Sequence, residues 1–248
     1  MLIDLHTHTY PLSWDSQLSA DELINRSKEA GLDGIVLSEH DFAWNPDDVR
    51  LLAERHNFLV IPGIEVNTDD GHILVIGPRR YSYGMHHTRE LARLGAEADG
   101  GMWAAHPYRR YSPWNWTIAQ ERADALDRGE RNEAYGIVSA LEVLNGRGSA
   151  RENLISHEIA DRLGLPGTAG TDSHRTADIG KTATYFDRDI KTPADLIDEL
   201  RAGRCWPVDL TDGSLIDLPE YHRAPADLDV RRAAKAARRA AYLASRPQ

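Results

Sequence analysis

Cysteine is almost absent from this chain, since Cys205 is the single cysteine among 248 residues. One thiol excludes a disulfide framework within the chain and fits a reducing compartment. Long apolar stretches are also lacking, because no run approaches the roughly 20 residues that a membrane-spanning helix requires. The first residues carry neither the basic region nor the apolar region of a secretory signal peptide. We therefore expect a cytoplasmic protein with no membrane partner.

An excess of basic residues is lacking as well: 29 Lys and Arg stand against 39 Asp and Glu, which gives a formal net charge of −10. This charge argues against strong binding of duplex nucleic acid, which requires a positive surface. The negative net charge does not exclude small phosphorylated substrates, because bound metal ions would make the electrostatic field at the site positive. A chain of this length suits either one α/β barrel or two small domains.

What the chain does contain is an alternation of short apolar runs with amphipathic segments, which favours βα units and a mainly parallel sheet. We expect strands near residues 1–8, 34–38, 58–65, 72–76, 102–106, 138–144, 167–171 and 182–186. Helices are expected near residues 19–30, 46–56, 88–97, 117–133, 149–163 and 192–202. About seven βα-like units within residues 1–210 favour one barrel over two domains.

The end of the chain differs in composition. Residues 228–244 are rich in Ala and Arg and have strong helix propensity. One interpretation is a basic helix that contacts an anionic partner. The other, which we favour, is a peripheral packing helix or a frayed end. We therefore divide the chain into a domain over residues 1–222 and a basic helix or tail over residues 223–248.

Histidines mark the ends of the predicted strands. The first pair lies in Asp4-Leu5-His6-Thr7-His8, where alternation along a strand directs residues 4, 6 and 8 to one face. Such a pair alone is weak evidence for a metal site. Similar groups recur along the chain, namely Glu39-His40-Asp41, Gly63-Ile64-Glu65, Gly71-His72, Ala105-His106-Pro107 and Thr171-Asp172-Ser173-His174. Because the loops of α/β folds converge where strands end, this recurrence predicts a polynuclear metal site.

The mixture of histidine and carboxylate ligands suits zinc, manganese or iron and disfavours magnesium or calcium. Two or three such divalent ions would supply a metal-bound hydroxide near neutral pH and would hold the oxygens of a phosphoryl group. Any one of these histidines, taken alone, is more simply a hydrogen-bonded core or surface residue. The complete set predicts that these residues bind metal ions.

The same motifs resemble, in their order and spacing, those of the PHP (polymerase and histidinol phosphatase) family and its small metal-dependent phosphoesterases. They are Asp-Leu-His6-Thr-His8-Thr, Ser-Glu-His40-Asp41, Gly-Ile-Glu65, Ala-His106-Pro and Thr-Asp172-Ser-His174. The resemblance spans roughly residues 1–210. It implies a single-domain α/β fold, a distorted seven-stranded (βα) barrel of the TIM-like PHP type. It also implies phosphoester hydrolysis at a trinuclear metal centre.

The resemblance further implies which residues hold the metals. The first metal would be bound by His6, His8, Glu65 and Asp172. Glu65 would bridge to a second metal that is completed by Asp15 and His40. The third metal would be bound by His72, His106 and His174. Among these ligands, the expected catalytic residues are Glu65, His106, Asp172 and His174. Without the resemblance, Asp15 would be interpreted as a solvated acid in a loop.

Arginines close to these motifs are candidates for substrate binding, because a guanidinium matches a phosphate group with two parallel hydrogen bonds. The candidates are Arg109, Arg147 and Arg175, and an ordinary surface position is the alternative for each. Residues 108–116 are rich in aromatics. They are either a stacking platform for a base or a packed loop over the barrel mouth.

Taken together, the motifs predict a metal-dependent phosphoesterase that acts on a small phosphorylated substrate, such as a nucleotide, an RNA end or another phosphomonoester. Histidinol-phosphate phosphatase is the alternative within the same chemistry. A metal-binding PHP module with a structural or regulatory role is the alternative of a different class. The enzyme is favoured because every ligand position is filled.

Overall fold

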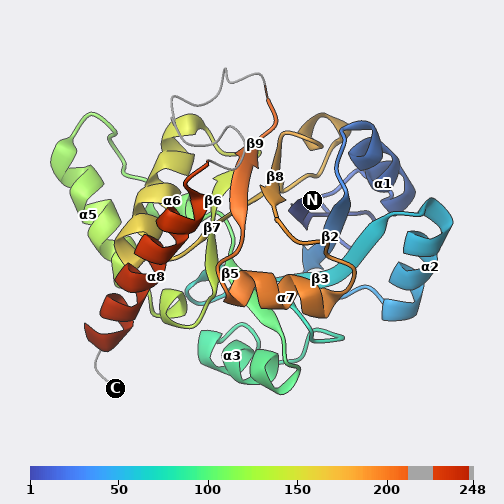
Figure 1. Ribbon diagram of the computed structural model, residues 1–248, viewed down its shortest axis with the longest axis horizontal. Coiled ribbons are helices and arrows are strands. Elements are labelled where there is room, and N and C mark those ends of the chain that lie inside the picture. Colours follow the sequence, from blue (N-terminus) through green and yellow to red (C-terminus); the bar gives the residue numbers. More distant parts are fainter. Residues whose placement is uncertain (212–225, 246–248) are drawn as a thin grey trace.

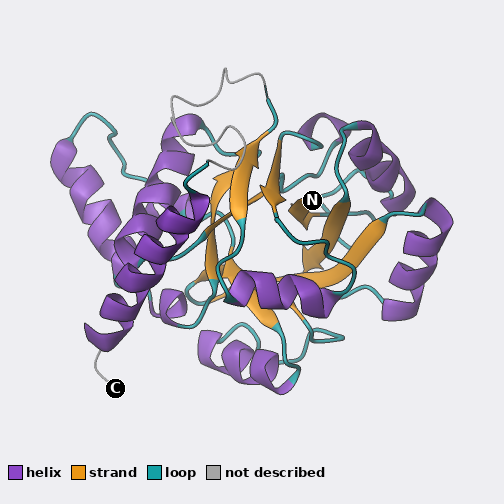
Figure 2. Cartoon of the chain, viewed as in Figure 1, coloured by secondary structure: helices purple, strands orange, loops and turns teal. Residues whose placement is uncertain are grey.

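A computed structural model describes residues 1–211 and 226–245 of the chain. Within them, nine strands form one sheet in the order β7-β6-β5-β4-β3-β2-β1-β8-β9. The strands are β1 (Leu2–Thr7), β2 (Gly34–His40), β3 (Leu59–Thr68), β4 (Gly71–Ile76), β5 (Gly101–Ala104), β6 (Ala140–Asn145), β7 (Gly167–Gly170), β8 (Thr182–Tyr185) and β9 (Trp206–Asp209). Figure 2 shows the strands at the centre of the molecule with helices around them.

The sheet curves into a nearly closed barrel, because the segment after β7 returns to the end of β1. The backbone N–H of Asp172 donates to the carbonyl of His6 (2.8 Å), and the N–H of His8 donates to the carbonyl of Ser173 (3.1 Å). Thr7 and Ser173 form a parallel bridge at the same place. The expected barrel-like α/β domain is therefore present. The expected number of seven strands is not confirmed, since β8 and β9 continue the sheet beyond β1.

Antiparallel strands interrupt the parallel order that the sequence predicts. Strands β1, β2 and β3 run parallel to one another, and so do β5, β6 and β7. Strand β4 is antiparallel to both of its neighbours, and β8 is antiparallel to β1 and β9. The β3–β4 turn consists of Asp69 and Asp70 alone, and a connection this short joins antiparallel strands only. The start of β4 therefore lies at the same end of the barrel as the carboxyl end of β3.

The helices lie around this sheet. They are α1 (Ala20–Glu29), α2 (Pro46–His56), α3 (Thr88–Glu97), α4 (Tyr108–Tyr111), α5 (Ala119–Glu130), α6 (Ala150–Leu163), α7 (Pro193–Arg201) and α8 (Leu228–Ser245). Figure 1 shows α1 and α2 on one side and α5, α6 and α8 on the other. Local signals set several boundaries: Ser149 and Glu152 form a capping box at the start of α6, and Gly164 ends that helix in a left-handed conformation.

Apolar side chains fill the barrel between these layers. Trp103 and Phe186 are the largest fully buried ones, and Ile3, Leu5 and Ile61 are buried with them. In the described part of the chain, no helix is long and apolar enough to cross a membrane. The C-terminal helix α8 lies beside α6 (Figure 1). The boundary that we placed between residues 222 and 223 lies outside the described residues.

Candidate metal centre

All nine residues that the resemblance implies as ligands lie at one end of the barrel. His6 is on β1, His40 on β2, Glu65 on β3 and His72 on β4. The others lie in the segments that follow β1, β5 and β7, and they are His8, Asp15, His106, Asp172 and His174. Since β4 is antiparallel, His72 at its start joins the residues at the ends of the parallel strands.

Four buried atoms at the centre of this group have no hydrogen-bond partner in the described structure: Nε2 of His6, Nε2 of His8, Oε2 of Glu65 and Oδ1 of Asp172. The Glu65 oxygen lies 3.3 Å from each of the two nitrogens. The Asp172 oxygen lies 3.7 Å from the His6 nitrogen and 3.4 Å from the His8 nitrogen.

Buried polar atoms without partners cost free energy, so this arrangement calls for a ligand. Tetrahedral donors that lie about 2.0–2.1 Å from a zinc ion are about 3.3–3.4 Å apart, which is close to the distances found here. The donor set therefore fits a divalent transition metal ion.

Glu65 contacts ligands on both of its sides. Its Oε1 lies 2.7 Å from Nδ1 of His72 and 2.9 Å from Nε2 of His106. Its Oε2 lies 3.0 Å from Nδ1 of His40, in addition to the His6 and His8 contacts. A carboxylate with donors around both oxygens is suited to bridge two metal ions.

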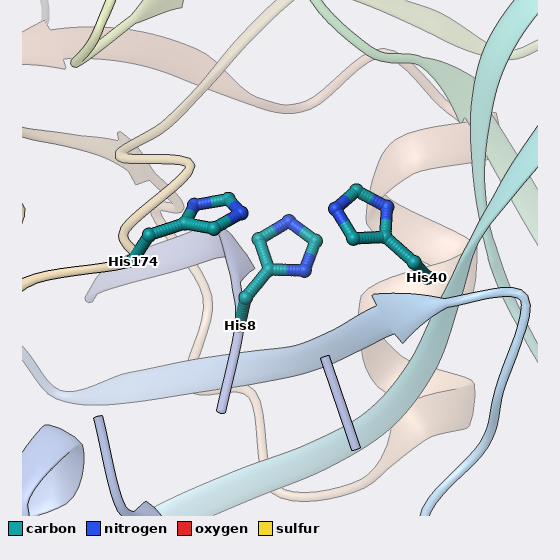
Figure 3. Close-up of side chains that lie close together, drawn as sticks. All are labelled: His8, His40 and His174. Atoms are coloured by element: carbon teal, nitrogen blue, oxygen red, sulfur yellow. The ribbon is translucent and has the colours of Figure 1, made fainter. Parts of the chain in front are cut away.

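The structure groups the remaining ligands differently from the sets that the resemblance implies. His174 lies with His8 and His40, and their three rings face one another in Figure 3. Oδ2 of Asp15 lies 3.1 Å from Nε2 of His174 and 3.5 Å from Nε2 of His40. His72 and His106 both contact Oε1 of Glu65, and their ring centroids are 5.1 Å apart.

The charges of the cluster favour cations. Burial alone would lower the pKa of His8, but the carboxylates of Asp172 and Glu65 outweigh it and raise this pKa to about 9. Burial alone would raise the pKa of Asp172, but the charge of His6 and the contact with His8 hold it below its ordinary value. Burial lowers the pKa of His106 and of His174. Because protons compete with metals for His8, metal binding is expected to weaken as the pH falls.

Two glutamates that the sequence analysis did not assign hold the histidine rings. Oε1 of Glu142 lies 3.0 Å from Nδ1 of His6, which directs Nε2 of the ring into the site. Glu39 acts on His8 through Ser13: the Ser13 hydroxyl donates to Glu39 (2.5 Å) and lies 3.1 Å from Nδ1 of His8. The sequence signal that could have identified Glu142 is an acid inside an otherwise apolar run, three residues before Asn145.

Backbone geometry at the site is unusual. His106 and Asp172 have positive φ angles of 26° and 53°, a left-handed region that non-glycine residues rarely adopt. Strained residues of this kind concentrate at functional sites. Asp4, which shares a face of β1 with His6, helps to hold this backbone, because it accepts hydrogen bonds from the N–H groups of His6 (3.1 Å) and Thr171 (2.9 Å).

The three candidate arginines are placed differently. The Arg109 guanidinium donates to Oδ2 of Asp172 and lies 3.0 Å from Nε2 of His106. Nη1 of Arg147 lies 3.0 Å from Nδ1 of His174. Arg175 is exposed, and none of the described contacts ties its side chain to the cluster. A cavity of about 240 Å³ opens beside His72, His106 and Arg109.

Two family models match the chain. A PHP domain model matches residues 4–126, and a PHP-associated model matches residues 150–205. No curated protein matches the chain. Several solved structures share the fold at low sequence identity.

One is a protein from Bifidobacterium adolescentis that is named as a metal-dependent phosphoesterase. It is 15% identical with a TM-score of 0.50, and the match covers 79% of this chain and 94% of that one. An amidohydrolase from Chromobacterium violaceum, solved with bound sulfate and without metal, is 18% identical with a TM-score of 0.53 over 85% and 99% of the two chains. A lesion-specific endonuclease from Pyrococcus furiosus is 17% identical with a TM-score of 0.50 over 84% of this chain and 57% of that one. By its two family matches and its barrel, the chain belongs to the PHP domain family.

Proposed function

We propose that this chain is a metal-dependent hydrolase that removes phosphate from a small phosphomonoester. The observation that carries the proposal is the group of four buried, unpartnered donor atoms on His6, His8, Glu65 and Asp172, which lie at metal-ligand spacing. The family supports a phosphoesterase, and the arginines beside the cluster supply the positive groups that a phosphate requires.

The protein's own residues have separable roles in this proposal. His6, His8, Glu65 and Asp172 would hold the first of two or three metal ions, and zinc, manganese and iron all suit them. Bound ions would lower the pKa of a water and neutralise the phosphoryl oxygens. Glu142 and Ser13 hold the histidine rings in the tautomers that present Nε2 to the site.

Arg109 and Arg147 are placed to orient the non-reacting oxygens of the phosphate group. Both guanidinium groups are partly exposed and contact ligands of the cluster at the same time. The 240 Å³ cavity beside His72 and His106 offers room for part of the leaving alcohol. The loop between α4 and α5, which follows His106 closely in the sequence, presents Trp114, which is fully exposed and suits stacking against a base. A nucleotide or an RNA end is therefore our preferred class of substrate.

The test is a screen of purified protein with added manganese or zinc against nucleotides, short RNA with a terminal phosphate, histidinol phosphate and simple phosphomonoesters. Phosphate release is the readout. Wild-type protein should release phosphate from at least one of them, and His6→Ala and Asp172→Ala should lower the rate by at least about 10³-fold. Both variants must keep the wild-type circular dichroism spectrum.

Retained activity in either variant would show that the metal assignment is wrong. Less than about one equivalent of bound transition metal, with no activity toward any substrate, would overturn the enzymatic proposal in favour of a structural or regulatory PHP module.

A further inference from the structure

A second cavity, of about 700 Å³, lies between α8 and the barrel. Its wall includes residues just before β6 and β7, such as Val138, Leu165 and Pro166, so it lies near the amino ends of these strands. The metal centre lies at their carboxyl ends. The volume falls within the range of small-molecule sites, about 300–1,000 Å³. This cavity is therefore separate from the candidate metal centre.

The helix that covers this cavity turns its basic residues inward. A helix at a protein surface ordinarily buries an apolar stripe and exposes its charges. On α8, the half-buried positions are Arg231, Arg232, Lys235, Arg239 and Tyr242, which recur at helical spacing. The apolar side chain of Val230 is exposed instead, and Leu243, which also lines the cavity, is partly exposed. The inward face of α8 is thus cationic in a protein whose net charge is −10.

The described wall of the cavity carries six cationic side chains and one carboxylate. The cations are Arg201, Arg231, Arg232, Lys235, Arg238 and Arg239, and the carboxylate is that of Asp161. Asp161 lies 3.0 Å from Nζ of Lys235, and Arg239 donates to backbone carbonyls, including that of Tyr135. Asp99, Asp187 and Asp227 pair with other wall arginines but do not line the cavity, and all three are more than half exposed. Exposed ion pairs neutralise charge weakly.

The Arg232 side chain also lies in the wall of this cavity. Its Nη1 lies 2.8 Å from Oδ2 of Asp187, which fixes the orientation of the guanidinium. Its Nε and Nη2 are buried and have no hydrogen-bond partner in the described structure. Because these two nitrogens have almost no accessible surface, they do not face the open volume of the cavity, and the other wall cations supply the charge that a ligand would meet.

Apart from Ser139 and His157, which lies 3.1 Å from Asp161, the rest of the wall is mainly apolar. Val138, Leu165, Pro166, Trp206 and Pro207 contribute to it. We infer that the cavity between α8 and the barrel binds a small organic anion, with a phosphate, sulfonate or carboxylate group beside the α8 cations and an apolar or aromatic body against these side chains. The site is independent of the proposed phosphoesterase activity.

The probe for the test is 8-anilinonaphthalene-1-sulfonate, an aromatic anion that fluoresces when it is bound in an apolar environment. Its uncharged analogue, N-phenyl-1-naphthylamine, reports the apolar contribution alone. With the full chain, the sulfonate should bind saturably at one site and at least about tenfold more tightly than the amine, with salt weakening only the sulfonate. Equal affinity for the two probes would overturn the inference that the site prefers anions.

Three variants test whether the sulfonate probe binds in this cavity. Ala234→Trp fills the cavity from an exposed position of α8 and should abolish sulfonate binding. Arg238→Gln removes one wall charge and should weaken binding about threefold. Arg89→Gln removes an exposed arginine on α3 and should change nothing. Wild-type thermal stability establishes that each variant folds. Unchanged binding in folded Ala234→Trp protein would place the probe elsewhere and overturn the inference.

Discussion

Glu142→Gln tests how the barrel holds its metal ligands. Oε1 of Glu142 lies 3.0 Å from Nδ1 of His6, and Oε2 accepts hydrogen bonds from the backbone N–H of His106 (2.9 Å) and from Nδ2 of Asn145 (3.0 Å). All three partners act as donors, so a carboxylate satisfies them. A carboxamide has only one acceptor oxygen, and its NH₂ group must face at least one of the donors.

Either orientation of the new side chain has a cost. If the NH₂ group faces His106, two donors lose their acceptor. If it faces His6, the ring must give up its Nδ1 proton and carry a proton on Nε2, the atom that faces Glu65 and Asp172. The loss of one hydrogen bond to a charged group is worth about 1.5–3 kcal/mol. We therefore expect metal binding to weaken by about 10- to 100-fold.

The assay is a competitive titration of zinc against a chromophoric chelator, with the thermal midpoint of the metal-free protein measured in parallel. Glu199→Gln is the matched control. Glu199 is equally buried, but its partner is Arg204, at 2.7 Å, far along the chain from the ligands. This control should lose thermal stability and keep its zinc affinity. Wild-type zinc affinity in Glu142→Gln, or an equal loss in Glu199→Gln, would refute the reasoning.

Three further predictions concern single residues. Arg109→Ala should lower kcat/KM about 10- to 100-fold, whereas exposed Arg175→Ala should stay within about twofold in the same assay. Gly170→Ala should destabilise the fold by about 1–3 kcal/mol in urea unfolding, because the added methyl group would lie 2.7 Å from Oε1 of Glu142. Burial raises the pKa of the Cys205 thiol to about 12, so the neutral form is favoured in the folded state. Its contribution to stability is therefore complete below about pH 9 and is lost as the pH rises toward 12. Iodoacetamide should leave the native protein unmodified at about pH 8 and should alkylate it in urea.

Much of the fold follows from local sequence patterns. The apolar runs at residues 34–38, 72–76 and 182–186 correspond to β2, β4 and β8, although β8 ends at Tyr185, and the expected helix over residues 46–56 is α2. The residues at the ends of the runs, together with the family resemblance that supplied Asp15, were enough to select nine side chains that lie together, because strand ends converge in this type of fold. Strand β9 was missed, since it is short and contains Pro207, which weakens any strand pattern.

Other features depend on contacts that a local pattern does not contain. The direction of β4 follows from the short turn at Asp69 and Asp70, and it explains how His72 reaches the site from the start of a strand. The role of Glu142 depends on His6, which is 136 residues away in the sequence. The position of His174 beside Asp15 depends on the contact between the segments that follow β1 and β7.

The seam at which the barrel closes has a consequence for biosynthesis. The four-donor group needs His6 and His8 from the first strand and Asp172 from the segment that follows β7. These parts meet through the Thr7–Ser173 bridge, a contact of very long sequence separation. Contacts of this kind form late in folding, because the chain between them must first be ordered. A growing polypeptide therefore has no complete first metal position until residue 172 has left the ribosome, and an ion bound there would fasten His6 and His8 to a residue more than 160 positions further along the chain.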